Sequence, residues 1–197
     1  MEKFHTFNLG DFKITVLNDF GGTWSIYEMM PKVPQAALKS AFAANGYDET
    51  VARDGNNLLI DTGSEKILID AGLPSPGDGI PRSGNLAAAL QASGVDPNDI
   101  DLLIITHGDF DHIGGLGNYS RAKIILPDHA WKLWIDNTEK MVEEQTNLFK
   151  DNLTDAELEQ RKAGRRRYAS VLKQLENRIK RIDVDTEIVP GIQLLSA

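Results

Sequence analysis

Four side chains of metal-binding types lie close together in residues 105–115, which read ITHGDFDHIGG. Imidazole nitrogens and carboxylate oxygens are ligands for divalent ions such as zinc, manganese and iron. One pair, His107 with Asp109, could hold one ion. The other pair, Asp111 with His112, could hold a second, and two ions roughly 3.5–4 Å apart can share and activate one water. The spacing therefore predicts a metal centre that activates water.

A buried strand must bring this cluster to its position. Residues 102–105 are all aliphatic, which is typical of a strand buried on both faces. Proteins of the α/β class build their sites at the carboxyl ends of such strands. In an extended segment the side chains of His107 and Asp109 point to the same side, and the glycines at 114–115 let the chain turn sharply afterwards. Each of these residues alone is common at a strand end, so the prediction rests on their combined spacing.

The other elements predict an α/β layered fold in a single domain, residues 1–197. The glycines at 21–22 are expected to end the first strand, and Ser83 to cap a helix. The capping box of Thr154 and Glu157 is expected to open the longest helix. We expect strands over 12–19, 102–105 and 121–127, a hairpin over 57–72, a loop with a short helix over 25–45, a loop over 72–84, helices over 83–94, 129–150 and 154–182, and a final strand with a turn at 190–191.

Composition excludes several classes of function. The chain has no cysteine, so any metal must bind through nitrogen and oxygen. Its formal net charge of −8 argues against binding to nucleic acid or to a membrane surface. No apolar run approaches the ~20 residues that cross a bilayer, and the start shows no signal peptide. We expect a cytoplasmic protein, with an exported protein already trimmed of its signal as the alternative. The basic cluster RKAGRRRY at 161–168 is interpreted as a solvated helix face.

The cluster resembles the H-x-H-x-D-H signature of the metallo-β-lactamase superfamily. The similarity extends over most of residues 10–127 and includes the hairpin NLLIDTGSEKILIDAG and the strand AKIILP. It implies an αβ/βα sandwich of two similar halves and a hydrolase with one or two metal ions. His107 matches the first histidine of the signature, Asp111 its aspartate and His112 its last histidine. Asp70 matches a family position beside the site, which implies a supporting role behind the ligands.

Asp109 stands where the signature has its middle histidine. A carboxylate can bind a metal, but it is a harder, charged ligand that shifts preference from zinc towards manganese or iron. We therefore expect one or two divalent ions, zinc as the first choice and manganese or iron as alternatives.

The family resemblance also implies further ligands in a second half. The ending EIVPGIQLLSA resembles a segment that leads into that half. His5 and His129 lie outside any matching motif and are not proposed as ligands. We expect the chain to be a truncated sandwich, the first half plus a helical insertion at about 128–182. An uncovered sheet edge would then favour self-association.

The leading hypothesis is a metal-dependent hydrolase that acts on an ester, a lactone or a phosphoester as a small-molecule substrate. Asp111 would bind metal and orient the attacking water, as the resemblance implies. The segment 20–50 and the insertion would shape the pocket, as in lactonase-like and phosphotriesterase-like members. Four aromatic residues could line that pocket or pack in the core, namely Trp24, Tyr27, Trp131 and Trp134.

Three alternatives remain at this point. Asp109 alone suggests a non-haem iron redox protein. A chain without second-half ligands would be a non-catalytic metal-binding or inactive fragment. Asp109 and Asp111 as a glycosidase pair is a weak alternative, because neighbours at i and i+2 are poorly placed for two carboxyls on opposite sides of a sugar.

Overall fold

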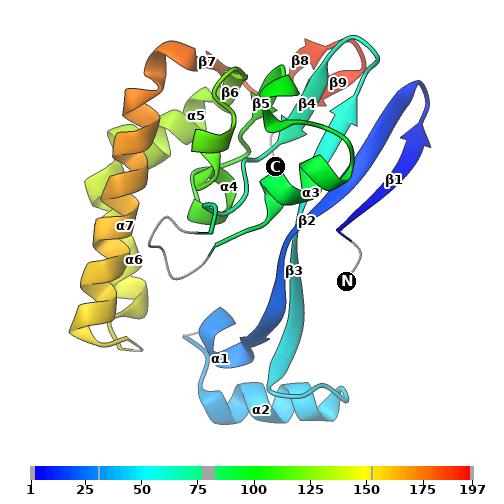
Figure 1. The fold of residues 1–197 in the computed structure, drawn as a ribbon. Coiled ribbons are helices and arrows are strands. Elements are labelled where there is room, and N and C mark those ends of the chain that lie inside the picture. Colours follow the sequence, from blue (N-terminus) through cyan, green and yellow to red (C-terminus); the bar gives the residue numbers. More distant parts are fainter. Residues whose placement is uncertain (1–2, 31, 77–82, 152, 196–197) are drawn as a thin grey trace.

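One seven-stranded mixed sheet forms the centre of the protein (Figure 1). The computed structural model describes residues 3–30, 32–76, 83–151 and 153–195. The strands follow the order of the sequence, with antiparallel pairing from β1 to β4 and parallel pairing from β4 to β7. The strands of this sheet are β1 (Phe4–Leu9), β2 (Phe12–Ser25), β3 (Thr50–Asp61), β4 (Lys66–Ile69), β5 (Leu102–Ile104), β6 (Lys123–Pro127) and β7 (Ile179–Ile182), and a separate antiparallel hairpin joins β8 (Thr186–Val189) to β9 (Ile192–Leu194).

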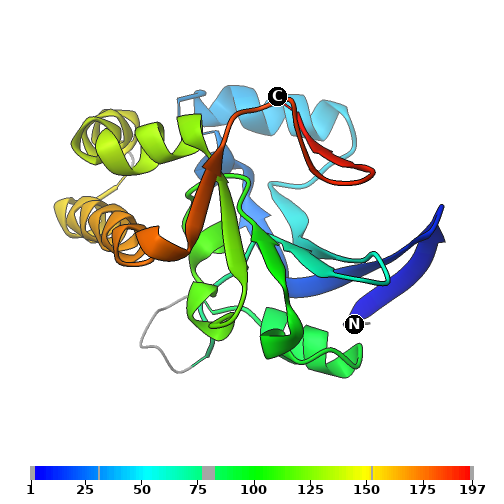
Figure 2. The same ribbon diagram turned by 90° about the horizontal axis from the view of Figure 1, so that it is seen from above.

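Alternate side chains of the strands pack on the two faces of the sheet. In β5, Leu103 belongs to a large cluster under the helices, whereas Leu102 and Ile104 belong to a smaller cluster against the β8–β9 hairpin. Figure 2 shows these layers from above. The arrangement confirms the predicted α/β layered fold. The helices are α1 (Ile26–Met29), α2 (Gln35–Ala44), α3 (Leu86–Ala92), α4 (Phe110–Ile113), α5 (Asp128–Trp131), α6 (Thr138–Phe149) and α7 (Asp155–Gln174), with short 3-10 turns at Pro97–Asp99, Leu116–Asn118 and Glu176–Arg178.

The ribbon of β2 and β3 is longer than the sequence predicted. The glycines at 21–22 do not end the strand, because β2 continues to Ser25 and pairs with β3 as far as Thr50. The guanidinium of Arg53 lies 3.5 Å from the centre of the Trp24 ring, so this polar ribbon has side-chain packing of its own. It projects from the sheet and carries α1 and α2 at its end, where a loop with one short helix was expected (Figure 1).

Helix α3 begins later than predicted because another strand caps it. We expected Ser83 as the capping residue, but the helix begins at Leu86. The Asp19 carboxylate of β2 accepts hydrogen bonds from the backbone N–H groups of Leu86, at 2.9 Å, and of Leu73, at 2.7 Å. Burial raises the pKa of Asp19, and these two hydrogen bonds oppose that shift. This buried carboxylate thus holds both ends of the segment between β4 and α3.

The helical segment after β6 contains an irregular turn and ends early. Helix α5 runs into a π-helical turn over Lys132–Asp136, and α6 and α7 then lie side by side. The predicted capping box at Thr154 is present. The predicted helix 154–182 is wrong at its end, because residues 179–182 form β7, whose isoleucines pair with the apolar strand β6. No helix in the part of the chain that the structure describes has the length and apolar character that a membrane span requires.

Candidate metal centre

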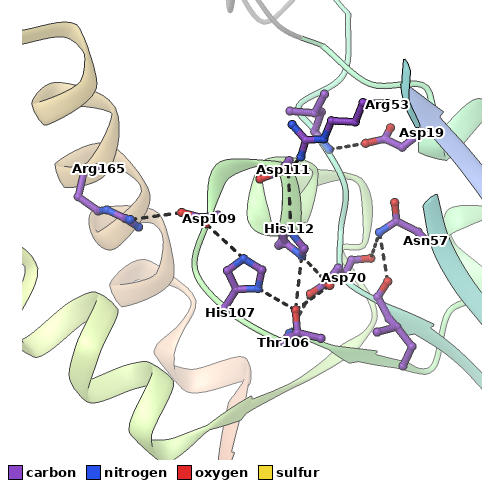
Figure 3. Close-up of polar contacts among 12 residues, drawn as sticks. Asp19, Arg53, Asn57, Asp70, Thr106, His107, Asp109, Asp111, His112 and Arg165 are labelled. Carbon is purple, nitrogen blue, oxygen red and sulfur yellow. Dashed lines mark hydrogen bonds and ion pairs between the residues drawn. The ribbon is translucent and has the colours of Figure 1, made fainter. Parts of the chain in front are cut away.

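The ITHGDFDHIGG cluster lies at the carboxyl edge of the parallel strands (Figure 3). Strand β5 ends at Ile104, and the chain crosses the sheet edge before α4 begins at Phe110. Asp70 directly follows the neighbouring strand β4 and has a φ of 61°, which is uncommon for a residue other than glycine. Its backbone N–H donates to the Ile104 carbonyl at 2.8 Å. The two strand ends are therefore tied together, and Asp70 reaches the cluster.

Both histidines of the cluster have their Nδ1 atom occupied by a hydrogen bond. His112 Nδ1 lies 2.7 Å from Asp70 Oδ2. The Thr106 hydroxyl donates to the same oxygen at 2.8 Å and lies 3.0 Å from His107 Nδ1. The Asp70 carboxylate can only accept, so His112 Nδ1 must donate to it. The Thr106 hydroxyl gives its proton to Asp70 and therefore accepts a hydrogen bond from His107 Nδ1. Both Nδ1 atoms thus carry protons. Each neutral ring then keeps the lone pair of Nε2 for a metal.

Each Nε2 atom faces one carboxylate. His107 Nε2 lies 3.3 Å from Asp109 Oδ2, and His112 Nε2 lies 3.9 Å from Asp111 Oδ2. The centres of the two imidazole rings are 3.8 Å apart, so the two pairs adjoin each other. The structure therefore brings together the four predicted ligands in the predicted pairs.

The spacing of these donors fits a divalent ion. Two ligands that each lie about 2.1 Å from one zinc ion at a near-tetrahedral angle are roughly 3.4 Å apart. The first pair, at 3.3 Å, has this spacing, and the second, at 3.9 Å, is wider by about half an ångström. Among the described residues, no three histidine, aspartate or glutamate side chains gather closely enough to hold an ion together. The cluster thus offers its donors as two pairs.

Two arginines that the sequence did not point to contact the carboxylates. Arg53 Nη2 of β3 lies 3.1 Å from Asp111 Oδ2. Arg165 Nη2 of α7 lies 3.3 Å from Asp109 Oδ1, and its Nη1 donates to the Gly108 carbonyl at 3.1 Å. Each aspartate of the cluster therefore has one cationic neighbour from a distant part of the chain.

Three pKa values reflect this arrangement of charges. Burial raises the pKa of Asp109, but a hydrogen bond from His107, which requires a proton on Nε2 that a metal ion would displace, and the charge of Arg165 outweigh it, so the pKa lies below its ordinary value. Burial lowers the pKa of His112, but the hydrogen bond and charge of Asp70 outweigh it, so the pKa is raised. Burial also lowers the pKa of Arg165, although Asp109 opposes this shift, and an arginine stays charged in proteins.

A cavity of about 300 Å³ opens beside the cluster, between the β2–β3 ribbon and α4. Asp111 and Arg53 form its polar wall. Its apolar wall includes Phe20, Trp24 and Phe110. The cavity therefore joins a carboxylate of the candidate metal centre to a surface suited to an apolar group.

The other residues considered from the sequence have different surroundings. Trp131 and Trp134 are both buried in the main core, and the Trp134 ring also lies 6.0 Å from the His107 ring, between centres. Tyr27 donates to Glu49 at 2.8 Å on the projecting ribbon. His5 lies in β1 and His129 in α5, and neither belongs to the cluster.

The interpretation of residues 161–168 as a solvated helix face is wrong for Arg165. Only 7% of this residue is exposed, whereas the neighbouring Arg166 is solvated and pairs with Glu139 at 2.7 Å. The buried residues of α7 are Leu158, Arg165, Ala169 and Leu172, which recur at helical spacing. This periodicity is the signal in the sequence that could have identified Arg165.

Comparison with known proteins gives a family match over most of the chain. The family described as "Metallo-beta-lactamase superfamily" matches residues 50–191. "Metallo-beta-lactamase domain-containing protein 1" of Xenopus laevis is 35% identical over 79 residues, which is 40% of this chain and 31% of the frog protein. "Exodeoxyribonuclease YycJ" of Bacillus anthracis is 38% identical over 77 residues, 39% of this chain and 25% of that protein.

Solved structures show the same fold. AidC, described as a dizinc quorum-quenching lactonase in complex with a product, has a TM-score of 0.75 at 22% identity. The hydrolase AbOPH of the beta lactamase superfamily has a TM-score of 0.69, also at 22% identity. The alignments cover 95% of this chain and 63% of each of these structures. The chain thus spans less than two thirds of the length of the proteins that it resembles.

Proposed function

Because the chain belongs to the metallo-beta-lactamase superfamily, we propose that it is a metal-dependent hydrolase with its centre at residues 107–112. The observation that carries this proposal is the approach of each histidine Nε2 to one carboxylate, at 3.3 Å for His107 with Asp109 and 3.9 Å for His112 with Asp111. In the proposal these four residues are the metal ligands. One or two ions would bind, with zinc as the first choice and manganese or iron as alternatives.

The residues of the chain have distinct tasks in the proposed reaction. A bound divalent ion supplies a Lewis acid and lowers the pKa of water towards neutrality. Asp111 accepts a hydrogen bond from the attacking water and orients it towards the substrate. Asp70 keeps the proton of His112 on Nδ1, and Thr106 does the same for His107, so both Nε2 atoms stay available.

The cavity supports an ester or a lactone with an apolar portion as the substrate. Phe20, Trp24 and Phe110 offer apolar surface next to Asp111. Among the described residues, Arg53 donates one hydrogen bond, to Asp111, although a guanidinium has five N–H donors. Its other donors can reach an oxygen of a carbonyl or phosphoryl group in the cavity, so a phosphoester is the second substrate class.

The test combines metal analysis with hydrolysis assays. The wild-type chain, a His107→Ala/His112→Ala variant and a His129→Ala control are freed of metal, loaded in separate samples with zinc, manganese or iron(II), and analysed for metal content. His129 is exposed and lies outside the cluster, so its loss removes one histidine without touching the centre. Each protein is then assayed with p-nitrophenyl butyrate, an acyl-homoserine lactone and bis-p-nitrophenyl phosphate.

We expect the wild-type and control proteins to retain zinc and to hydrolyse the ester or the lactone, and the double variant to do neither. Metal retention without turnover would support the alternative of a non-catalytic metal-binding protein. Iron retention with redox activity would support a non-haem iron protein. An equal metal content in the double variant and the control would contradict the assignment of the cluster as the centre.

A further inference from the structure

Arg165 is a buried cation that faces the position at which this chain departs from the family signature. Its side chain is 6% exposed, and its two terminal nitrogens contact the Gly108 carbonyl and the Asp109 carboxylate. The guanidinium also lies 3.5 Å from the centre of the Trp134 ring. Burying a charge is costly unless it is paired and hydrogen-bonded, so these contacts fix the position of Arg165.

The two oxygens of Asp109 have different partners. Oδ1 lies 3.3 Å from Arg165 Nη2, and Oδ2 lies 3.3 Å from His107 Nε2 (Figure 3). A free carboxylate can bind a cation with both oxygens. Here the arginine occupies one oxygen, so a single oxygen remains on the side of His107.

We propose that Arg165 is a positioning residue that makes Asp109 act as a single-oxygen, charge-compensated substitute for the middle histidine, and so keeps the preference of the centre for zinc. The inference rests on the proposed function, because it assumes that Asp109 binds metal.

The physical reason is a balance of charge. A carboxylate in place of an imidazole adds a negative charge and a hard donor, which favours manganese or iron over zinc. The positive charge of Arg165 offsets that of Asp109, so the aspartate and arginine together carry the same net charge as a neutral histidine. Binding through one oxygen also limits the number of ligands, as in the four-coordinate sites that zinc prefers.

The helical segment after β6 also packs against the cluster, beside Arg165. Gly108 has no side chain, and a Cβ atom there would lie 2.7 Å from the Trp134 ring. Trp134 belongs to the π-helical turn Lys132–Asp136, and such turns are frequent at functional sites. The ring of Trp134 therefore packs against both the guanidinium of Arg165 and the backbone at Gly108.

The experiment compares the affinities of the metal-free protein for zinc and for manganese, by competition with a chromophoric chelator. The variants are Arg165→Gln, which removes the charge, and Arg165→Lys, which keeps the charge but not the planar fork. Arg166→Gln is the matched control, because it removes an adjacent arginine of α7 and its exposed ion pair with Glu139. Circular dichroism checks that each variant is folded.

We expect Arg165→Gln to reduce the ratio of zinc to manganese affinity by at least about tenfold, within the range for residues that support metal ligands. The lysine variant should fall between, and the Arg166→Gln control should match the wild type. In an Asp109→His background, Arg165→Gln should leave the ratio unchanged, because the neutral histidine needs no compensation. If the Arg165→Gln variant fails to fold, Arg165→Lys replaces it in the same comparison. It should change the ratio in the chain with Asp109 and leave the ratio unchanged in the Asp109→His chain.

Two results would overturn the inference, and only one of them would also overturn the proposed function. An unchanged ratio in a folded Arg165→Gln variant that binds metal would reject the role of Arg165 alone. A wild-type chain that binds neither metal would reject the proposed function together with the inference.

Discussion

Replacing Asp70 with asparagine should weaken metal binding although Asp70 is not a proposed ligand. Asparagine tolerates the positive φ of this position and has nearly the same size, so the backbone should be kept. Its amide oxygen can still accept the hydrogen bond that the Thr106 backbone N–H gives to Oδ1 at 2.8 Å. Its NH₂ group, however, would face His112 Nδ1, which is 2.7 Å from Oδ2. A donor there favours the tautomer with the proton on Nε2, the atom needed for metal.

Both effects have magnitudes that are known for contacts of this kind. Loss of a partner of this kind behind a ligating histidine typically lowers metal affinity about 10–100-fold. That range corresponds to roughly 1.4–2.7 kcal/mol of binding free energy. The metal-free chain should also lose about 1.5–3 kcal/mol of unfolding free energy, because a hydrogen bond to a charged group is lost. Asp70 is buried, with 7% exposed, so solvent should screen this loss little.

The assay is a zinc titration against a chromophoric chelator, together with long-range ¹⁵N–¹H spectra that report the tautomer of His112. Asp101→Asn is the matched control, because Asp101 accepts the Lys66 backbone N–H at 2.8 Å at the opposite end of β5. The reasoning is refuted if a folded Asp70→Asn variant binds zinc as tightly as the control. An unchanged tautomer with weaker binding would refute the stated cause.

Three further predictions follow from single contacts. Gly108→Ala should destabilise the fold by about 1–3 kcal/mol in urea unfolding and change Trp134 fluorescence, because its Cβ would lie 2.7 Å from that ring; equal stability would show that the ring can move aside. Tyr119→Phe should be neutral or stabilising in the same assay, because the buried hydroxyl has no hydrogen-bond partner among the described residues, and a loss above about 1 kcal/mol would reveal a partner. In the metal-free chain, His112 has a raised pKa, so its stabilising effect should be complete below its ordinary value of 6.5 and be lost as the pH rises through the raised value. Unfolding midpoints of the wild type and His112→Gln should therefore converge towards alkaline pH, and a difference that grows with pH would contradict this sign.

The parts of the fold that local signals determine were predictable. The aliphatic strand β5, the β3–β4 hairpin and the capping box at Thr154 each depend on a few neighbouring residues. The prediction failed where contacts with distant segments determine where an element begins or whether it is a helix or a strand. Helix α3 begins where a carboxylate of β2 reaches it, 67 residues away in sequence, and β7 is a strand because β6 offers it a partner. Neither partner is visible from the local pattern.

The candidate site divides in the same way. Residues 107–112 are so close in sequence that a strand end and a short helix are enough to gather them. Arg53 and Arg165 contact the cluster across 58 and 56 residues, so no spacing rule could place them. Arg165 is also hidden by composition, because it lies among other arginines that are solvated. Only the helical recurrence of buried positions in α7 distinguishes it.

The two arginines differ in how freely they can move, and this difference assigns them different tasks. The side chain of Arg165 is 6% exposed and holds a backbone carbonyl as well as Asp109, so it has to remain in place when an ion binds. The side chain of Arg53 is 31% exposed, makes one described hydrogen bond, and lines the cavity. A cation beside Asp111 would compete directly with Arg53 for the carboxylate, and the guanidinium can then turn to an oxygen of the substrate. If the proposed function holds, Arg165 of α7 would stay paired with Asp109 while the metal is bound, whereas Arg53 of the β2–β3 ribbon would leave Asp111 and bind the substrate.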